Sequence, residues 1–181
     1  MFAAPPQPLV QTDAHLQDSF SGVSGNASVN QAAGAQHQQA NVRIVGVGQS
    51  SGSSIRVEQL RSAQPAAATG VDAHARIAGS AFAESSGISG LNQSAGFANQ
   101  NINALRVTVG AAPESLDDTV LSQSTAPTAA LAIASPASGE RVVETSDQAF
   151  AGSRGVVQLN QSAGVGNRTA NSLSIRVVDR P

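Results

Sequence analysis

A repeated segment constrains this chain more than any other feature. Residues 159–167 (LNQSAGVGN) have recognisable copies at residues 29–37 and 91–99. Each copy lies in a longer unit that aligns without gaps, with a Phe ten residues before the first Asn and a second Asn eleven residues after it. The Phe residues are Phe20, Phe82 and Phe150. Internal repetition of this kind predicts an architecture of stacked, equivalent units.

The repeats divide the chain into units and spacers. We expect a flexible leader at 1–17, repeat 1 at 18–47, a linker at 48–79, repeat 2 at 80–109, a linker at 110–147, and repeat 3 with a tail at 148–181. The Phe-to-Phe spacing is 62 and then 68 residues, so the linkers vary in length while the units do not. The first linker opens with a Gly- and Ser-rich run, which is typical of a flexible connection.

Within a unit, side chains alternate with the period of a β-strand. Ala27, Val29 and Gln31 share one face while Ser28 and Asn30 share the other. A Gly-containing turn at 33–34 follows, since Gly accepts a positive φ without steric cost, and a second strand closes the unit. The predicted fold is all-β, with three strand-turn-strand repeats stacked as a β-solenoid or amyloid-like β-arch core.

Stacking would place equivalent amides about 4.8 Å apart, where they can bond along a ladder. The candidate assembly ladder consists of the amides and glycines that recur at fixed positions: Asn30, Gln31, Gly34, Asn41, Asn92, Gln93, Gly96, Asn99, Asn103, Asn160, Gln161, Gly164, Asn167 and Asn171. The Phe residues are expected to pack over the end of each stack, with a binding stripe as the alternative. Open strand edges at both ends would template another chain, and Arg43, where the other units have Leu, is a candidate gatekeeper.

Composition excludes several classes of function. The 181 residues contain no Cys, Trp, Tyr or Lys, and the net charge of -2 argues against a nucleic-acid partner, which requires a basic face. No apolar run reaches the roughly 18 residues of a membrane-spanning helix, and the first residues lack the features of a signal peptide. The absence of Cys excludes disulfides and Cys-based zinc sites.

Catalytic and metal sites find little support. His15, His37 and His74 form no His-x-x-x-His pair or His–carboxylate cluster, and His37 takes a place that Asn holds in the other units. Asp117 and Asp118 are more simply explained as solvated linker residues. We therefore expect no catalytic residue, no metal, no cofactor and no small-molecule substrate.

The repeats resemble those of a known family. The last two units share a Gln-x-x-Gly-x-x-Asn pattern, formed by Gln93, Gly96 and Asn99 and by Gln161, Gly164 and Asn167. This pattern is similar to the repeats of bacterial functional amyloids. Curlin repeats have one residue fewer between Gln and Gly, whereas imperfect repeats with long variable linkers look more like the functional amyloid system of Pseudomonas (Fap).

The resemblance implies a secreted biofilm component that passes through the periplasm and an outer-membrane export pore and joins an extracellular cross-β fibre. Its partners would be itself or a homologous fibre subunit. Two departures favour a minor or regulatory component: main subunits of that system carry a Cys pair that is absent here, and the first repeat is degenerate.

Four hypotheses follow. The first is a fibre component that self-assembles through the Asn/Gln-containing repeats. The second is an accessory or chaperone-like modulator that binds the main amyloid subunit. The third is a secreted hydrolase on a β-helix, which no paired carboxylates support, and the fourth is a disordered isolated chain.

Overall fold

The computed structural model describes residues 10–48, 55–60, 70–110, 121–125 and 139–177, and this part of the chain is all-β without a helix. The strands form three layers that follow one another along the chain. The first layer contains β1 (Val10–Gln17), β2 (Ser24–Ala35), β3 (Gln38–Val47) and β4 (Ile55–Gln59); the second contains β5 (Val71–Ala78), β6 (Ser86–Phe97), β7 (Gln100–Val109) and β8 (Leu121–Thr125); the third contains β9 (Arg141–Thr145), β10 (Arg154–Val165) and β11 (Arg168–Val177).

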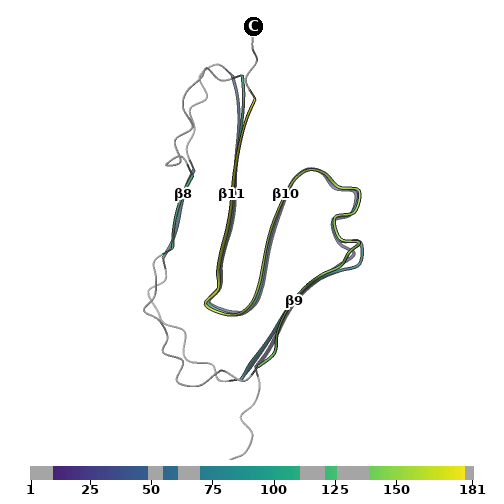
Figure 1. Ribbon diagram of the computed structural model, residues 1–181, viewed down its shortest axis with the longest axis vertical. Helices are drawn as coiled ribbons and strands as arrows, with labels where there is room; N and C mark the ends of the chain where they lie inside the picture. Colours follow the sequence, from purple (N-terminus) through teal and green to yellow (C-terminus); the bar gives the residue numbers. More distant parts are fainter. Residues whose placement is uncertain (1–9, 49–54, 61–69, 111–120, 126–138, 178–181) are drawn as a thin grey trace, which may run out of the picture.

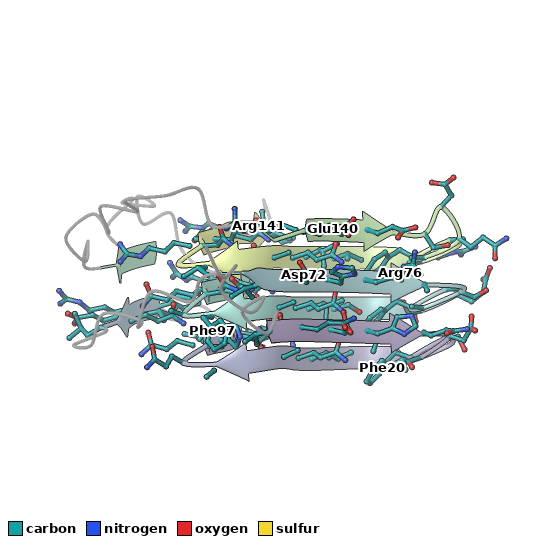
Figure 2. All side chains as sticks on the ribbon, turned by 90° about the horizontal axis from the view of Figure 1, so that it is seen from below. Phe20, Asp72, Arg76, Phe97, Glu140 and Arg141 are labelled. Atoms are coloured by element: carbon teal, nitrogen blue, oxygen red, sulfur yellow. The ribbon has the colours of Figure 1, made fainter. Side chains whose placement is uncertain are left out.

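Corresponding strands of the three layers pair in parallel and in register. They form sheet A (β1, β5, β9), sheet B (β2, β6, β10), sheet C (β3, β7, β11) and the two-stranded sheet D (β4, β8). Along the stack, each layer follows a winding path in which β10 lies between β9 and β11, and β11 lies between β10 and β8 (Figure 1). From the side, the layers lie above one another, with the first at the bottom and the third at the top (Figure 2).

The register places equivalent residues of the three repeats in the same column. Asn30, Asn92 and Asn160 pair in one column of sheet B, and the Gln that follows each of them pairs in the next column. The two arms of a repeat do not pair with each other, because β2 belongs to sheet B and β3 to sheet C. The turn lies at 36–37, three residues later than predicted: β2 runs to Ala35, β3 begins at Gln38, and Gln36 has the positive φ of 60°.

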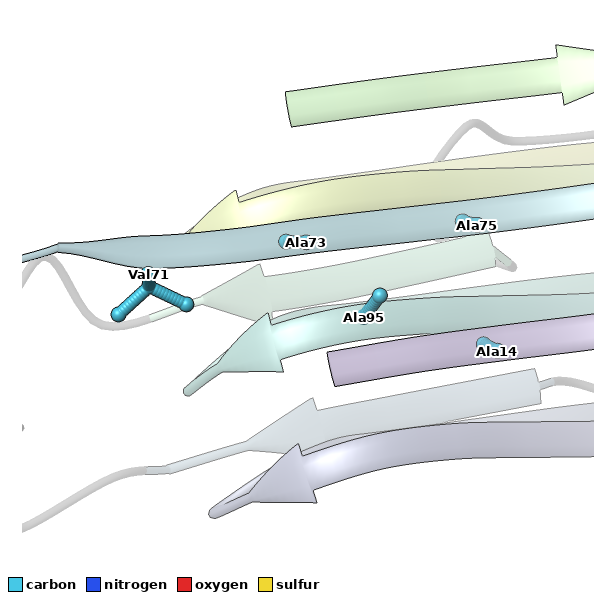
Figure 3. Close-up of a cluster of buried hydrophobic side chains, with 5 residues drawn as sticks. All are labelled: Ala14, Val71, Ala73, Ala75 and Ala95. Atoms are coloured by element: carbon cyan, nitrogen blue, oxygen red, sulfur yellow. The ribbon is translucent and has the colours of Figure 1, made fainter. Parts of the chain in front are cut away.

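Apolar side chains fill the space between sheets A and B. Near one end, small residues let the two sheets approach closely (Figure 3). This cluster contains Ala14, Val71, Ala73, Ala75 and Ala95. A second cluster joins Leu16, Ile77, Ala81, Phe82 and Leu91, and a third, beside sheet D, joins Ile55, Ile102 and Ala104. The core is therefore a set of narrow stripes that run along the stack.

The Phe residues stack on one another and do not cover the ends of separate stacks. Ring centroids are 5.1 Å apart between Phe20 and Phe82 and 5.2 Å apart between Phe82 and Phe150, with nearly parallel planes. Phe82 is 0% exposed, whereas Phe20 at the bottom of the column is 42% exposed. All three have positive φ values near 60°, which bulky residues rarely adopt. The stacked rings pack in the bend between sheets A and B and hold this backbone conformation.

Strands also occur where the sequence predicted flexible segments. β1 lies in the expected leader 1–17, β4 and β5 lie in the expected linker 48–79, and β8 and β9 lie in the expected linker 110–147. The expectation of flexibility is therefore corrected for β1, β5, β8 and β9, whereas the sequence of residues 55–60 was also compatible with a short strand or helix, and β4 forms there. Their signal was a period-two alternation such as Ala73, Ala75 and Ile77 in β5, all of them fully buried.

A one-residue deletion hid the equivalence of β1 and β5. Gln17 pairs with Ala78, an offset of 61 residues, whereas Ser24 pairs with Ser86, an offset of 62. Asp18 bridges the difference with a positive φ of 46°, and its carboxylate accepts a hydrogen bond from the Ser80 N–H at 2.8 Å. A gap-free alignment anchored at the Phe residues is therefore out of register by one residue along β1, which precedes Asp18.

Candidate assembly surface

Two ladders of asparagines fill the space between sheets B and C. One ladder comes from the first Asn of each repeat and the other from the second Asn. Within each layer the second Asn donates to the first, at 2.9 Å from Asn41 to Asn30, 3.0 Å from Asn103 to Asn92, and 3.0 Å from Asn171 to Asn160. In the middle layer Asn92 is 0% and Asn103 is 1% exposed. The buried interface between these sheets is therefore polar and hydrogen-bonded.

The ladders have one direction. Asn92 donates to Asn30 at 2.9 Å and Asn160 donates to Asn92 at 3.0 Å, so each amide nitrogen bonds the oxygen of the layer below. The second ladder follows the same direction, from Asn171 to Asn103 to Asn41. The third layer therefore presents amide oxygens at the top of the stack, and the first layer keeps amide N–H groups at its bottom.

The glutamines form a third ladder on the opposite face of sheet B. Gln93 donates to the side-chain oxygen of Gln31 at 2.7 Å, and Gln161 donates to that of Gln93 at 2.8 Å. The same nitrogens reach the backbone of sheet A, at Arg76 O from Gln93 and at Ala75 O from Gln161. Consecutive Asn and Gln residues thus tie sheet B to sheet C on one side and to sheet A on the other.

The recurrent glycines are required because backbones approach closely along the stack. Gly34, Gly96 and Gly164 have φ values of 108°, 104° and 114°. A Cβ atom on Gly34 would lie 1.8 Å from the Gly96 oxygen, and one on Gly96 would lie 2.0 Å from the Gly164 oxygen. A side chain at the first two positions would therefore meet the backbone of the layer above.

The turn column contains Asn99 and Asn167, with His37 in the first layer. Each side chain bonds the carbonyl oxygen four residues earlier, at 2.9 to 3.0 Å. The Asn167 N–H donates to the Asn99 side-chain oxygen at 2.9 Å, and the Asn99 N–H meets Nδ1 of His37 at 3.4 Å. His37 therefore makes the contacts of an Asn, in the tautomer that carries its proton on Nε2.

The structure places all fourteen candidate residues in five columns within one chain: the two Asn ladders, the Gln ladder, the Gly column and the turn column. Sequence reasoning missed two further polar columns on β3, β7 and β11. Gln100 donates to Gln38 at 2.6 Å, and Asn101 donates to the Ser94 hydroxyl at 2.8 Å. The signal was available, because a polar pair begins each of these strands.

Replacing Asn103 by Leu is expected to lower the free energy of unfolding by about 3 kcal/mol, because several buried groups each lose one hydrogen bond. These groups include Asn41 Oδ1 at 2.9 Å, Leu91 O at 3.1 Å and Asn92 Oδ1 at 3.0 Å. Urea denaturation followed by circular dichroism measures the change. The control is Asn171→Leu in the third layer, where solvent reaches the residue and the loss should stay near about 1 kcal/mol. Equal losses would contradict a burial-dependent role.

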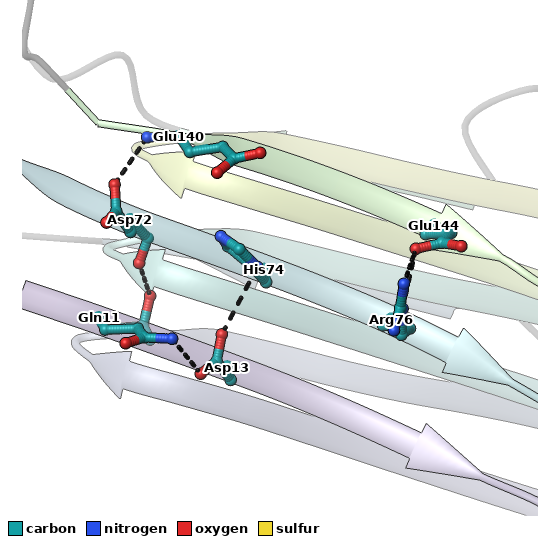
Figure 4. A network of polar contacts seen from close by, with 8 residues as sticks. Gln11, Asp13, Asp72, His74, Arg76, Glu140 and Glu144 are labelled. Atoms are coloured by element: carbon teal, nitrogen blue, oxygen red, sulfur yellow. Dashed lines mark hydrogen bonds and ion pairs between the residues drawn. The ribbon is translucent and has the colours of Figure 1, made fainter.

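The outer face of sheet A carries exposed pairs of polar and charged side chains (Figure 4). Arg76 Nε lies 2.8 Å from Glu144, and His74 Nδ1 lies 3.8 Å from Asp13. A shallow depression between these side chains is open to solvent. Exposed pairs of this kind contribute little stability, under about 1 kcal/mol each. Within the described ranges, no three His, Cys, Asp or Glu side chains gather to hold a metal ion.

Both ends of the stack are open in the part of the chain that the structure describes. Leu105 in the middle layer is 0% exposed, whereas Leu173 at the same position of the top layer is 38% exposed. The edges of β1 to β3 below and β9 to β11 above have no neighbouring strand in the described structure. Unpaired edges of this length are templates for further strands. None of the described residues forms a helix of the length and apolarity that crossing a membrane requires.

Comparison with known proteins agrees with the repeat pattern. No solved structure matches the chain. A family model described as the functional amyloid protein FapB/FapC family matches residues 3–178, which is nearly the whole chain. The match includes the strands of sheet A and the segments between the repeats, as well as the repeats themselves. The chain belongs to the FapB/FapC functional amyloid protein family.

Proposed function

We propose that the chain is a component of an extracellular cross-β fibre, in which copies stack head to tail. The third layer of one copy lies beneath the first layer of the next, and the β-arches continue as one β-solenoid. The observation that carries this proposal is the continuity of the ladders. Three columns of amides run in register through all layers and end at both open faces.

The two end faces are complementary. The amide oxygens at the top meet the amide N–H groups at the bottom of the next copy, which extends the ladders in the direction they have within the chain. Residues of the same kind also meet along the aromatic column, where Phe150 would stack under Phe20 of the next copy. A head-to-head contact would invert the winding path of the layer, so equivalent strands would not overlie one another (Figure 1).

The proposal is tested by incubating the purified chain alone, with thioflavin fluorescence, electron microscopy and fibre diffraction. Fibres with a meridional spacing near about 4.8 Å are expected. Deleting residues 148–178 should slow assembly more than any deletion outside the repeats, because it removes the cleanest repeat and the top face. A chain that remains monomeric would contradict self-assembly as its main function.

One observation favours the second candidate, a modulator of fibre assembly. The first layer places Arg43 in a column that otherwise contains Leu105 and Leu173. A charged residue in this column makes the bottom face less suited to self-addition than the top face. In that case the chain would change the lag time of a homologous fibre subunit at substoichiometric amounts while forming few fibres itself.

A further inference from the structure

Arg43 is a charged residue in a column of sheet C whose other members are leucines. In the register of sheet C, Leu105 lies above it in the second layer and Leu173 lies above that in the third. Leu105 is fully buried, so the column lies inside the stack. A guanidinium in such a column requires space and hydrogen-bond acceptors, because burying an unpaired charge is costly.

Gly90 supplies the space for this side chain. A Cβ atom on Gly90 would lie 2.1 Å from Nη2 of Arg43, whereas the equivalent residues of the other layers, Ser28 and Gln158, carry side chains. Nη1 of Arg43 donates to the Asn26 side chain and to the Ser28 hydroxyl. The guanidinium therefore reaches from sheet C to sheet B, beneath the position where the second layer has no side chain.

No carboxylate neutralises this guanidinium among the residues that the structure describes. Its Nε and Nη2 have no hydrogen-bond partner there, and the acceptors of Nη1 are neutral. Desolvation by burial lowers the pKa of Arg43 below its ordinary value. The side chain as a whole is half-buried, because no described strand covers the first layer from below.

We propose that Arg43 limits the rate and strength with which a second copy of this chain adds beneath the first layer. The proposal rests on the proposed head-to-tail stacking, in which Leu173 of the copy below lies about 4.8 Å from Arg43. Leu173 would cover the part of the Arg43 side chain that solvent still reaches and would offer the unpaired Nε and Nη2 no acceptor. A layer with a carboxylate at this position would pair with Arg43 and would bind more tightly than the chain's own third layer.

The test is a double-mutant cycle that compares the wild type, Arg43→Leu, Leu173→Glu and the double variant. The measured quantity is the critical concentration for fibre assembly. Each single variant should lower the critical concentration about tenfold, because the first removes the unpaired charge and the second supplies its partner. The double variant should have a critical concentration above the wild-type value, because the carboxylate introduced by Leu173→Glu is then buried between copies without a partner.

The cycle reports on the contact between copies. Within one chain Leu105 separates the two residues, so Arg43 and Leu173 are not neighbours. The control is Leu173→Gln, which is similar in size to Glu and uncharged, and should not lower the critical concentration. Independent effects of the two substitutions, or no gain from Arg43→Leu, would overturn the proposal. If the wild-type chain forms no fibres at all, the proposed function itself fails, which is a separate outcome.

Discussion

Gly96→Ala is expected to lower the free energy of unfolding by about 4 kcal/mol or more, which is a large part of the roughly 5–15 kcal/mol of a typical domain. The new Cβ atom would lie 2.0 Å from the oxygen and 2.8 Å from the carbonyl carbon of Gly164. Both atoms belong to the backbone of a paired strand, so they cannot move aside. The φ of 104° adds strain that L-residues rarely accept. Urea denaturation of the monomer, followed by circular dichroism, measures the loss.

Gly164→Ala is the matched control for this prediction. Its φ of 114° imposes the same backbone strain, but the new Cβ atom would meet the side chain of Arg141 at 2.8 Å instead of a backbone. Because that side chain comes from the top layer and can move, the loss should be only about 1 to 2 kcal/mol. If both variants lose the same free energy, φ strain alone would explain the requirement for Gly, and the close approach of the layers would be refuted.

Gly25→Ala is expected to stop fibre assembly while leaving the fold of the chain in place. Its φ is 102° and a Cβ atom would meet nothing within 4 Å, because the atom points away from the second layer. Gly87 and Gly155 lie in the same column as Gly25. A Cβ atom on Gly87 would lie 2.1 Å from the Gly25 oxygen, and one on Gly155 would lie 2.1 Å from the Gly87 oxygen. In a head-to-tail stack, the methyl group introduced at position 25 would meet the Gly155 oxygen of the copy below in the same way. Thioflavin kinetics and sedimentation should detect no fibres at concentrations at which the wild-type chain assembles.

The control for Gly25→Ala is Gly22→Ala. Gly22 has a φ of 67° with nothing within 4 Å of a new Cβ atom. The second layer has Glu84 in this column, also at positive φ, so a side chain is tolerated there in a stack. Gly22→Ala should therefore assemble like the wild type. Assembly of Gly25→Ala at the wild-type rate would contradict the head-to-tail contact.

A mixture of two blocked variants makes the prediction sharper. Gly25→Ala blocks the bottom face, and Gly164→Ala places its Cβ atom against the next copy at the top face. Each variant alone should remain monomeric, whereas an equimolar mixture should form a dimer of six layers and stop, because one free bottom face meets one free top face. Analytical ultracentrifugation measures this. A dimer of either variant alone would indicate that like faces meet, which the head-to-tail arrangement forbids.

The amide columns could be predicted from the sequence because the spacing of the Phe and the two Asn residues is the same in all three repeats. Asn30, Asn92 and Asn160 recur at a fixed distance from a Phe and a second Asn, so any in-register stack places them above one another. The opposite orientation of neighbouring Asn and Gln also followed from the two-residue period of a strand. His37 in place of an Asn was interpreted correctly, since a ring nitrogen bonds the Ala33 oxygen as the Asn amides bond theirs.

Sheet A could not be derived from the same repeat. β1 and β5 carry alternating side chains but little identity, and the shorter connection at Asp18 shifts them by one residue against the rest of the unit. The location of the turn was also missed, because Gly34 was assigned to the bend although it lies within β2, where the backbone of the next layer passes close by. These features depend on contacts between layers that no single repeat contains.

The sequence by itself determined the number of units, their parallel register and the columns of amides, because equivalent residues at fixed spacing coincide whenever equivalent strands stack. Only the tertiary structure decided which faces meet: the Gln ladder against sheet A, the Asn ladders against sheet C, and Arg43 beneath Gly90. The physical reason is that register is encoded locally by the period of the side chains. The winding path of a layer instead depends on how strands outside the repeats pack against both faces of sheet B.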